Sequence, residues 1–219
     1  MKKKIIPVLI AIVLIIVVFG IAFGGKIIDR YSYSKERADL NEIYAMQDET
    51  DTAIVLQDEI IEQRAKLLDG TYYVALSTAQ ELFNDRFYED AGEGLLLYTL
   101  PEAIVRTVVG TSEVSIGEEN KSFDYILSRY VGDTLYVALD YVKQYSNFSY
   151  EAFTDPNRLQ IYTSWDQRQI GYIKKDTKVR SLGGVKSEIL EDVKANDKVS
   201  VLEQMETWTK VKTADAVIG

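Results

Sequence analysis

The chain has 219 residues, 47% of them hydrophobic, so it can build packed cores and has room for one or two small domains. It contains no cysteine and no histidine, which excludes disulfides, thiol nucleophiles, thiolate metal sites and histidine-based acid–base catalysis. The net charge is −9, and residues 31–169 carry eleven Lys and Arg against twenty-five Asp and Glu. This acidic balance excludes nucleic acid as a partner, because phosphates need a basic surface.

The first predicted element is a membrane anchor. Ile5 to Phe23 is an uncharged run of nineteen residues, long enough at about 1.5 Å per residue to cross a hydrocarbon core of about 30 Å. Lys2, Lys3 and Lys4 precede it and favour a cytoplasmic N-terminus. We therefore predict that residues 1–30 form a cytoplasmic tip and a transmembrane helix. The lipid bilayer would be the partner of residues 5–23, and everything after about residue 30 would be extracellular.

Two alternatives exist for this segment. A cleaved signal peptide would have an apolar region of about 7–15 residues and a small-residue cleavage site, whereas this run is longer and Ala22-Phe23-Gly24 fits such a site poorly. A buried core helix would be the other alternative, but the run is apolar on every face. Residues 31–49, which follow, are polar and are predicted to be a stalk linker.

An internal repeat is the most informative feature of the chain. Tyr73-Val74-Ala75-Leu76 recurs as Tyr136-Val137-Ala138-Leu139, and each copy continues into a short amphipathic stretch and an aromatic, acidic segment. Each copy then closes on an apolar strand, Leu97-Tyr98-Thr99 or Ile161-Tyr162-Thr163. The spacing between the opening and closing motifs differs slightly between the copies, which indicates one inserted residue in the second.

Further strands are predicted around and between the copies. They cover residues 103–109 and 113–116, and residues 53–56 and 59–61 are expected to form a hairpin around Gln57-Asp58. Together these segments predict an α+β fold class, with a domain over residues 50–163 made of two similar β-α-β halves.

The C-terminal part is predicted to be a small β-barrel over residues 170–219, after a linker at 164–169. Closely spaced strands are expected at residues 179–181, 189–193, 199–202 and 208–211. These strands resemble the bacterial SH3-like domain, and that resemblance implies a closing strand after Trp208-Thr209-Lys210-Val211, which would begin at Ala216 to Gly219. We therefore expect the barrel to be partial, with more chain following it.

These segments resemble known families. The aromatic-Val-Ala-Leu strand, the short helix and the apolar-Tyr-Thr strand resemble the copper amine oxidase N-terminal-like domain, a non-catalytic stalk module of Gram-positive surface proteins. Val179-Arg180, the turn before Val199 and the strand Trp208-Thr209-Lys210-Val211 resemble the bacterial SH3-like domain.

The order of anchor, duplicated unit and SH3-like domain resembles the N-terminal region of family-18 glycoside hydrolases. The resemblance implies a downstream catalytic (β/α)₈ barrel in the same chain. Its Asp-x-x-Asp-x-Asp-x-Glu signature is absent from these 219 residues, so no catalytic residue is carried over.

Three aromatic residues are the candidate ligand-binding positions, because aromatic rings stack on sugar rings. Trp165 lies in the linker, where the sequence predicts no hydrophobic core for it to pack into. The alternative is that it packs between the two domains. Tyr172 and Trp208 would line a groove on the barrel, although Trp208 alternates with polar neighbours as a core strand residue would. The acidic clusters lie in turn or linker sequence, so no catalytic, cofactor-binding or metal residue is predicted, and no cofactor.

We therefore expect a non-catalytic, membrane-anchored extracellular region. It would position or target a cell-wall or chitin-type glycoside hydrolase by spacing and by binding peptidoglycan or polysaccharide. The alternative is a stand-alone surface protein that binds the cell wall.

Overall fold

The fold is mostly β, in the part of the chain that the structure describes. The computed structural model describes residues 12–21, 25, 32–165 and 167–219. It is 44% strand and 14% helix, so the predicted α+β class is wrong. The three helices among the strands are α2 (Leu40–Ile43), α3 (Leu76–Leu82) and α4 (Leu139–Lys143). Helices α3 and α4 are short because each amphipathic stretch gives way within two turns to a segment that leads into the next strand.

The membrane anchor is the second correction. The run from Ile5 to Phe23 lies partly outside the described residues. Residues 12–21 of this run are described, and they are helical. Over the described ranges, no helix has the length and apolar character needed to cross a membrane. A single-pass membrane protein with an extracellular part after residue 30 is therefore not supported.

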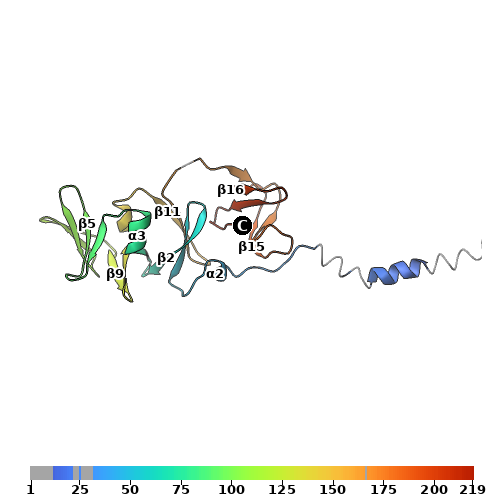
Figure 1. Ribbon diagram of the computed structural model, residues 1–219, viewed down its shortest axis with the longest axis horizontal. Coiled ribbons are helices and arrows are strands. Elements are labelled where there is room, and N and C mark those ends of the chain that lie inside the picture. The colour runs from blue at the N-terminus through green and yellow to red at the C-terminus, as the bar shows by residue number, and fades with distance from the viewer. Residues whose placement is uncertain (1–11, 22–24, 26–31, 166) are drawn as a thin grey trace, which may run out of the picture.

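A seven-stranded sheet forms the centre of the molecule (Figure 1). Its order is β11-β12-β1-β2-β3-β10-β9, and every neighbouring pair is antiparallel except β1 and β12, which are parallel. The hairpin predicted around Gln57-Asp58 is confirmed as β1 and β2. The strands of this sheet are β1 (Asp51–Leu56), β2 (Glu59–Leu68), β3 (Thr71–Ala75), β9 (Ser128–Val131), β10 (Thr134–Ala138), β11 (Ser149–Phe153) and β12 (Arg158–Tyr162).

The two copies of the repeat meet at the middle of this sheet. Strands β3 and β10 pair antiparallel with Val74 opposite Val137, and these are equivalent positions of the repeated Tyr-Val-Ala-Leu motif. The repeated strands therefore face each other across a local two-fold axis. Helix α3 packs on β10 and α4 packs on β3, so each helix covers the strand of the other copy.

The hairpins of the two copies keep the same register. Ser128 pairs with Val137 in β9–β10 just as Ala65 pairs with Val74 in β2–β3. In the closing hairpins, Tyr150 pairs with Ile161 just as Phe87 pairs with Tyr98. The same ladder also pairs Ser149 with Tyr162, so this register fits either Ile161 or Tyr162 as the equivalent of Tyr98, and the inserted residue stays a prediction.

A five-stranded antiparallel sheet lies at one end of the molecule (Figure 1). Its inward side chains, which include Phe87, Leu96 and Val105, are buried in one core with the helices and the central sheet. Phe83 and Phe148 stack in this core with ring centroids 4.3 Å apart and join the two copies. The strands of this sheet, in spatial order, are β4 (Phe87–Asp90), β5 (Leu95–Thr99), β6 (Ile104–Val108), β7 (Glu113–Ile116) and β8 (Glu119–Ser122).

The C-terminal part contains two small sheets. They pack around the buried side chains of Val179, Leu190, Val193 and Val217. Ala216 to Gly219, the expected start of a closing strand, runs antiparallel to β17: Lys212 bridges Ile218, and Val211 and Gly219 exchange two backbone hydrogen bonds of 2.8 and 3.0 Å. One sheet has β13 (Ile170–Tyr172), β16 (Lys198–Gln204) and β17 (Thr209–Lys212), and the other has β14 (Thr177–Arg180) and β15 (Ile189–Val193).

Residues 32–46, which we call the N-terminal strap, do not form the predicted stalk. The strap runs parallel to β15: the amide of Ala38 donates to the carbonyl of Ile189 at 3.0 Å, and the amide of Ile189 donates to the carbonyl of Glu36 at 2.8 Å. Asp39 then caps α2 through its carboxylate. Because these backbone groups need partners that the adjacent edge of β15 supplies, this polar segment docks against the C-terminal sheets.

Candidate functional site

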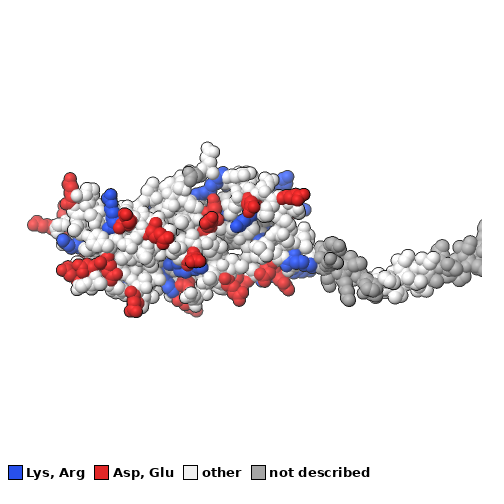
Figure 2. Space-filling view, viewed as in Figure 1, with Lys and Arg blue, Asp and Glu red and all other residues white. Residues whose placement is uncertain are grey.

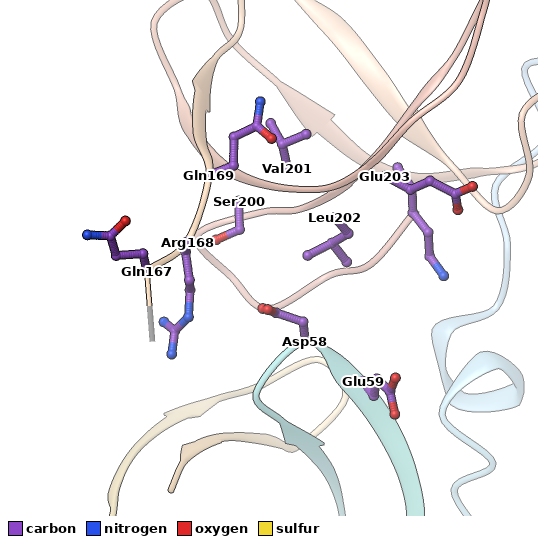
Figure 3. A pocket seen from close by; sticks show the side chains of 10 residues that line it. Asp58, Glu59, Gln167, Arg168, Gln169, Ser200, Val201, Leu202 and Glu203 are labelled. Carbon is purple, nitrogen blue, oxygen red and sulfur yellow. The ribbon is translucent and has the colours of Figure 1, made fainter. Parts of the chain in front are cut away.

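The candidate site is a cleft of roughly 360 Å³ between the central sheet and the C-terminal sheets. Three segments meet there: the β1–β2 turn, the connector at residues 167–169, and strands β16 and β17 (Figure 3). The lining residues are Asp58, Glu59, Gln167, Arg168, Gln169, Ser200, Val201, Leu202, Glu203 and Lys210.

An ion pair between a buried lysine and a partly exposed aspartate fixes one side of the cleft. Gln57 has a positive φ of 54°, which makes the β1–β2 turn tight and places Asp58 beside β17. The ammonium of Lys212 lies 2.6 Å from Asp58 Oδ1, donates to the carbonyl of Gln57, and lies 3.3 Å from the hydroxyl of Tyr162. The Lys212 side chain is only 2% exposed. The turn is therefore held against the C-terminal part by a charge that has no access to water.

The connector is fixed on its other side. The guanidinium carbon of Arg168 lies 3.7 Å from the centroid of the Tyr162 ring, a close cation–π contact. The amide of Val201 donates to the carbonyl of Gln169 at 2.8 Å. Because both ends of the connector are bound, the cleft is preformed.

The chemistry of the cleft suits binding by hydrogen bonds. Asp58, Glu59 and Glu203 face two cations, Arg168 and Lys210, and Asp58 is already neutralised by Lys212. The glutamine amides and Ser200 add neutral donors and acceptors. Across the described residues, no group of three or more acidic side chains could hold a metal ion. A mixed set of this kind favours a polar ligand without large net charge.

The surface charge agrees with this interpretation. On the face shown in Figure 2, acidic and basic side chains are interspersed, and acidic ones predominate. No broad basic area is visible on this face, and such an area is what a nucleic acid needs.

The predicted aromatic residues lie in different environments. Trp165 is 59% exposed, so it does not pack between the two parts of the molecule as the alternative held. Tyr172 is 67% exposed at the end of β13. Trp208 is partly buried and contacts the loop between β14 and β15, where a Cβ on Gly183 would come within 3.2 Å of the Trp208 ring. Trp165 and Tyr172 therefore stay available to a ligand, and Trp208 packs against its own domain.

Several residues of the site could not be found from the sequence. Lys212 and Asp58 are 154 residues apart, and their strands meet only in the folded chain. Arg168 lies in the linker that was predicted, but its partner Tyr162 was assigned to strand packing. No local pattern marks these contacts.

One perturbed carboxyl lies elsewhere. Burial, with the nearby Asp215 carboxylate contributing, raises the pKa of Glu191 above its usual range. Glu191 is on β15 and does not line the cleft. It therefore supplies no acid for chemistry there.

The fold and site define a mostly β protein with an internal duplication and a polar cleft beside its C-terminal sheets. Comparison of the chain with models of known protein families, with characterised proteins and with solved structures finds no match.

Proposed function

We propose that the chain is a non-catalytic, polysaccharide-binding region. The observation that carries this proposal is the preformed polar cleft with two highly exposed aromatic side chains close to it in the chain. Trp165 lies two residues before Gln167, and Tyr172 lies three residues after Gln169. Polysaccharides offer what these groups need: ring faces that stack on aromatic side chains, and hydroxyls that both donate and accept hydrogen bonds.

The resemblance to the accessory region of family-18 glycoside hydrolases supports a role in holding such an enzyme on a cell-wall or chitin-type glycan. The binding role does not depend on that resemblance, because the cleft would act in the same way in a stand-alone cell-wall-binding protein.

Co-sedimentation of the full chain with insoluble chitin and with purified peptidoglycan tests the proposal. We expect depletion of the chain from the supernatant. The double substitution Trp165→Ala and Tyr172→Ala should weaken binding by at least about fivefold, because each aromatic stacking contact contributes about 0.5–1.5 kcal/mol.

Tyr88→Ala is the matched control. Tyr88 is an exposed tyrosine on β4 in the five-stranded sheet, outside the cleft, and its loss should leave binding unchanged. If the chain stays in solution with both polymers, or if the double variant sediments as well as the parent chain, the proposal fails.

A further inference from the structure

A second pocket, of roughly 290 Å³, lies where the two copies of the repeat meet. The β2–β3 hairpin contributes one wall, and the segment before β9 contributes the other. The pocket shares no lining residue with the cleft described above. Its lining residues are Asp69, Thr71, Tyr73, Ser112, Phe123, Asp124, Tyr125, Ile126 and Arg129.

The floor of this pocket is rigid. Tyr73 is fully buried, and its hydroxyl donates to the carbonyl of Ile126 at 2.8 Å. Arg129 donates from one nitrogen to Asp69 at 2.7 Å and from another to the Tyr73 hydroxyl at 3.2 Å. The guanidinium carbon also lies 4.8 Å from the centroid of the Tyr73 ring. These contacts hold the cation in one place.

Above the floor, several polar side-chain groups are free to form hydrogen bonds with a ligand. In the described part of the chain, the hydroxyls of Thr71, Ser112 and Tyr125 and the carboxylate of Asp124 make no hydrogen bond to another residue. Burial raises the pKa of Tyr125 to about 12, with Asp140 and Asp124 contributing. Tyr125 therefore stays protonated at neutral pH and can act as a donor.

The side walls are aromatic. The rings of Phe123 and Tyr125 lie with their centroids 5.6 Å apart and their planes tilted by 55°. This arrangement leaves an apolar surface beside the open hydroxyls, a combination that recognises a molecule with one apolar face and a polar edge.

The charges in the pocket select the class of ligand. Arg129 disfavours a small cation, and the exposed carboxylates of Asp69 and Asp124 disfavour a small anion, because like charges repel. A neutral ring that carries several hydroxyls avoids both penalties. Each of its hydroxyls can donate to a carboxylate and accept from Tyr125 or a serine.

We propose that this pocket binds a single neutral sugar ring. Asp124 accepts hydrogen bonds from ring hydroxyls, Tyr125 donates one, and the rings of Phe123 and Tyr125 pack on the apolar face of the sugar. The site goes beyond the polysaccharide-binding cleft and does not depend on it, because the two have no residue in common.

The test is an NMR titration of the ¹⁵N-labelled full chain with glucose and with N-acetylglucosamine, each up to about 50 mM. We expect saturable shifts for the amides of residues 71, 112, 123–126 and 129. Asp124→Asn and Tyr125→Ala should each weaken the affinity at least about fivefold, through the charged hydrogen bond and the stacking contact. Asp85→Asn is the control, since Asp85 is exposed in the loop between α3 and β4.

Two further titrations distinguish failure of the sugar pocket from failure of the polysaccharide-binding cleft. Methylammonium and acetate should cause no saturable shifts at these amides; if either does so and the sugars do not, the assignment to a neutral sugar is overturned. The variant with Trp165→Ala and Tyr172→Ala should titrate like the parent chain. The sugar pocket can therefore fail while polysaccharide sedimentation succeeds, and the reverse also holds.

Discussion

Lys212 shows how one side chain can join two parts of a molecule. Its ammonium is withdrawn from water and lies close to three acceptors: the Asp58 carboxylate, the Gln57 carbonyl and the Tyr162 hydroxyl. All three belong to the central sheet or its turn, whereas Lys212 lies on β17. Taking an ammonium out of water costs several kcal/mol unless such partners surround it. The cost of taking the Lys212 ammonium out of water is therefore offset only when the two parts are docked.

Replacing Lys212 by methionine should destabilise the protein by about 1–3 kcal/mol. The methionine keeps most of the apolar stem but leaves the three acceptors without their cation. The penalty stays below that of a fully buried pair because the Asp58 side chain is 36% exposed and can rehydrate. Urea unfolding of the two proteins gives the difference directly.

Lys210→Met supplies the comparison, because Lys210 lies two residues away on the same strand and is exposed. We expect its effect to stay within about 0.5 kcal/mol, the range of ordinary surface substitutions. Equal effects of the two substitutions would mean that the Lys212 contacts contribute nothing to stability.

At the scale of single elements, the sequence predicted strands better than it predicted their partners. The repeated Tyr-Val-Ala-Leu motif correctly marks two strands that run into short helices, with Ala75 and Ala138 as equivalent N-caps. It does not show that the hairpin of one copy joins the central sheet while the equivalent hairpin of the other joins a separate sheet. Strand partners depend on contacts between residues far apart in the chain, and local patterns carry no information about those contacts.

The same limit explains the candidate site. Trp165 and Tyr172 could be singled out because an aromatic residue type and its position in or beside a linker are visible in the sequence itself. The cleft could not be predicted, because it forms where the β1–β2 turn meets β16, more than a hundred residues later. One local signal was present and was missed: Asp69-Gly70 is a strong hairpin turn, and it joins β2 to β3.

That turn carries a prediction of its own. Asp69 and Gly70 both have positive φ, 51° and 80°, as a two-residue hairpin of this type requires. Gly70→Ala should destabilise the protein by about 1–2 kcal/mol, because an alanine resists this left-handed backbone. The cause is the backbone alone, since a Cβ at Gly70 would have no neighbour within 4 Å. Thermal and urea unfolding measure the change.

Gly92→Ala is the control for this turn. Gly92 also lies in a turn, but its φ is outside the left-handed region, and a Cβ there would make an ordinary contact of 3.4 Å with Asp90. We expect a change within about 0.5 kcal/mol. A Gly70→Ala protein as stable as this control would show that the hairpin tolerates another turn type.

For the whole molecule, the N-terminal strap decides whether the C-terminal sheets and the central sheet act as one unit. The strap pairs with β15 and then inserts Tyr44 into a small core with Ala53, Val55 and Ala216. The Tyr44 ring is 1% exposed, and its hydroxyl donates to the carbonyl of Ala216 at 3.2 Å. This one ring therefore contacts the beginning of the central sheet and the end of the chain.

Arg158 strengthens the same junction. It is buried on β12, and it donates to the carbonyl of Asp215 at 3.0 Å, while its guanidinium carbon lies 5.4 Å from the centroid of the Tyr44 ring. The strap, β12 and residues 215–216 thus form one packed contact. Because the cleft lies between these same two parts of the molecule, its shape depends on their remaining docked.

Tyr44→Ala should therefore loosen the C-terminal sheets as well as lower stability. Truncating a buried aromatic side chain costs about 3–5 kcal/mol, whereas Tyr44→Phe removes only one hydrogen bond, worth about 1 kcal/mol. In hydrogen exchange, the amides of Ile189 and Gly219, which donate to backbone carbonyls, and of Val217, which donates to the Thr213 hydroxyl, should lose protection in Tyr44→Ala and keep most of it in Tyr44→Phe. Amides of the five-stranded sheet, such as Leu96 and Val105, should exchange alike in both variants, since they lie in a different core. If Tyr44→Ala instead speeds exchange equally in all sheets, the ring supports global stability only, and the strap is not what docks the two parts that enclose the cleft.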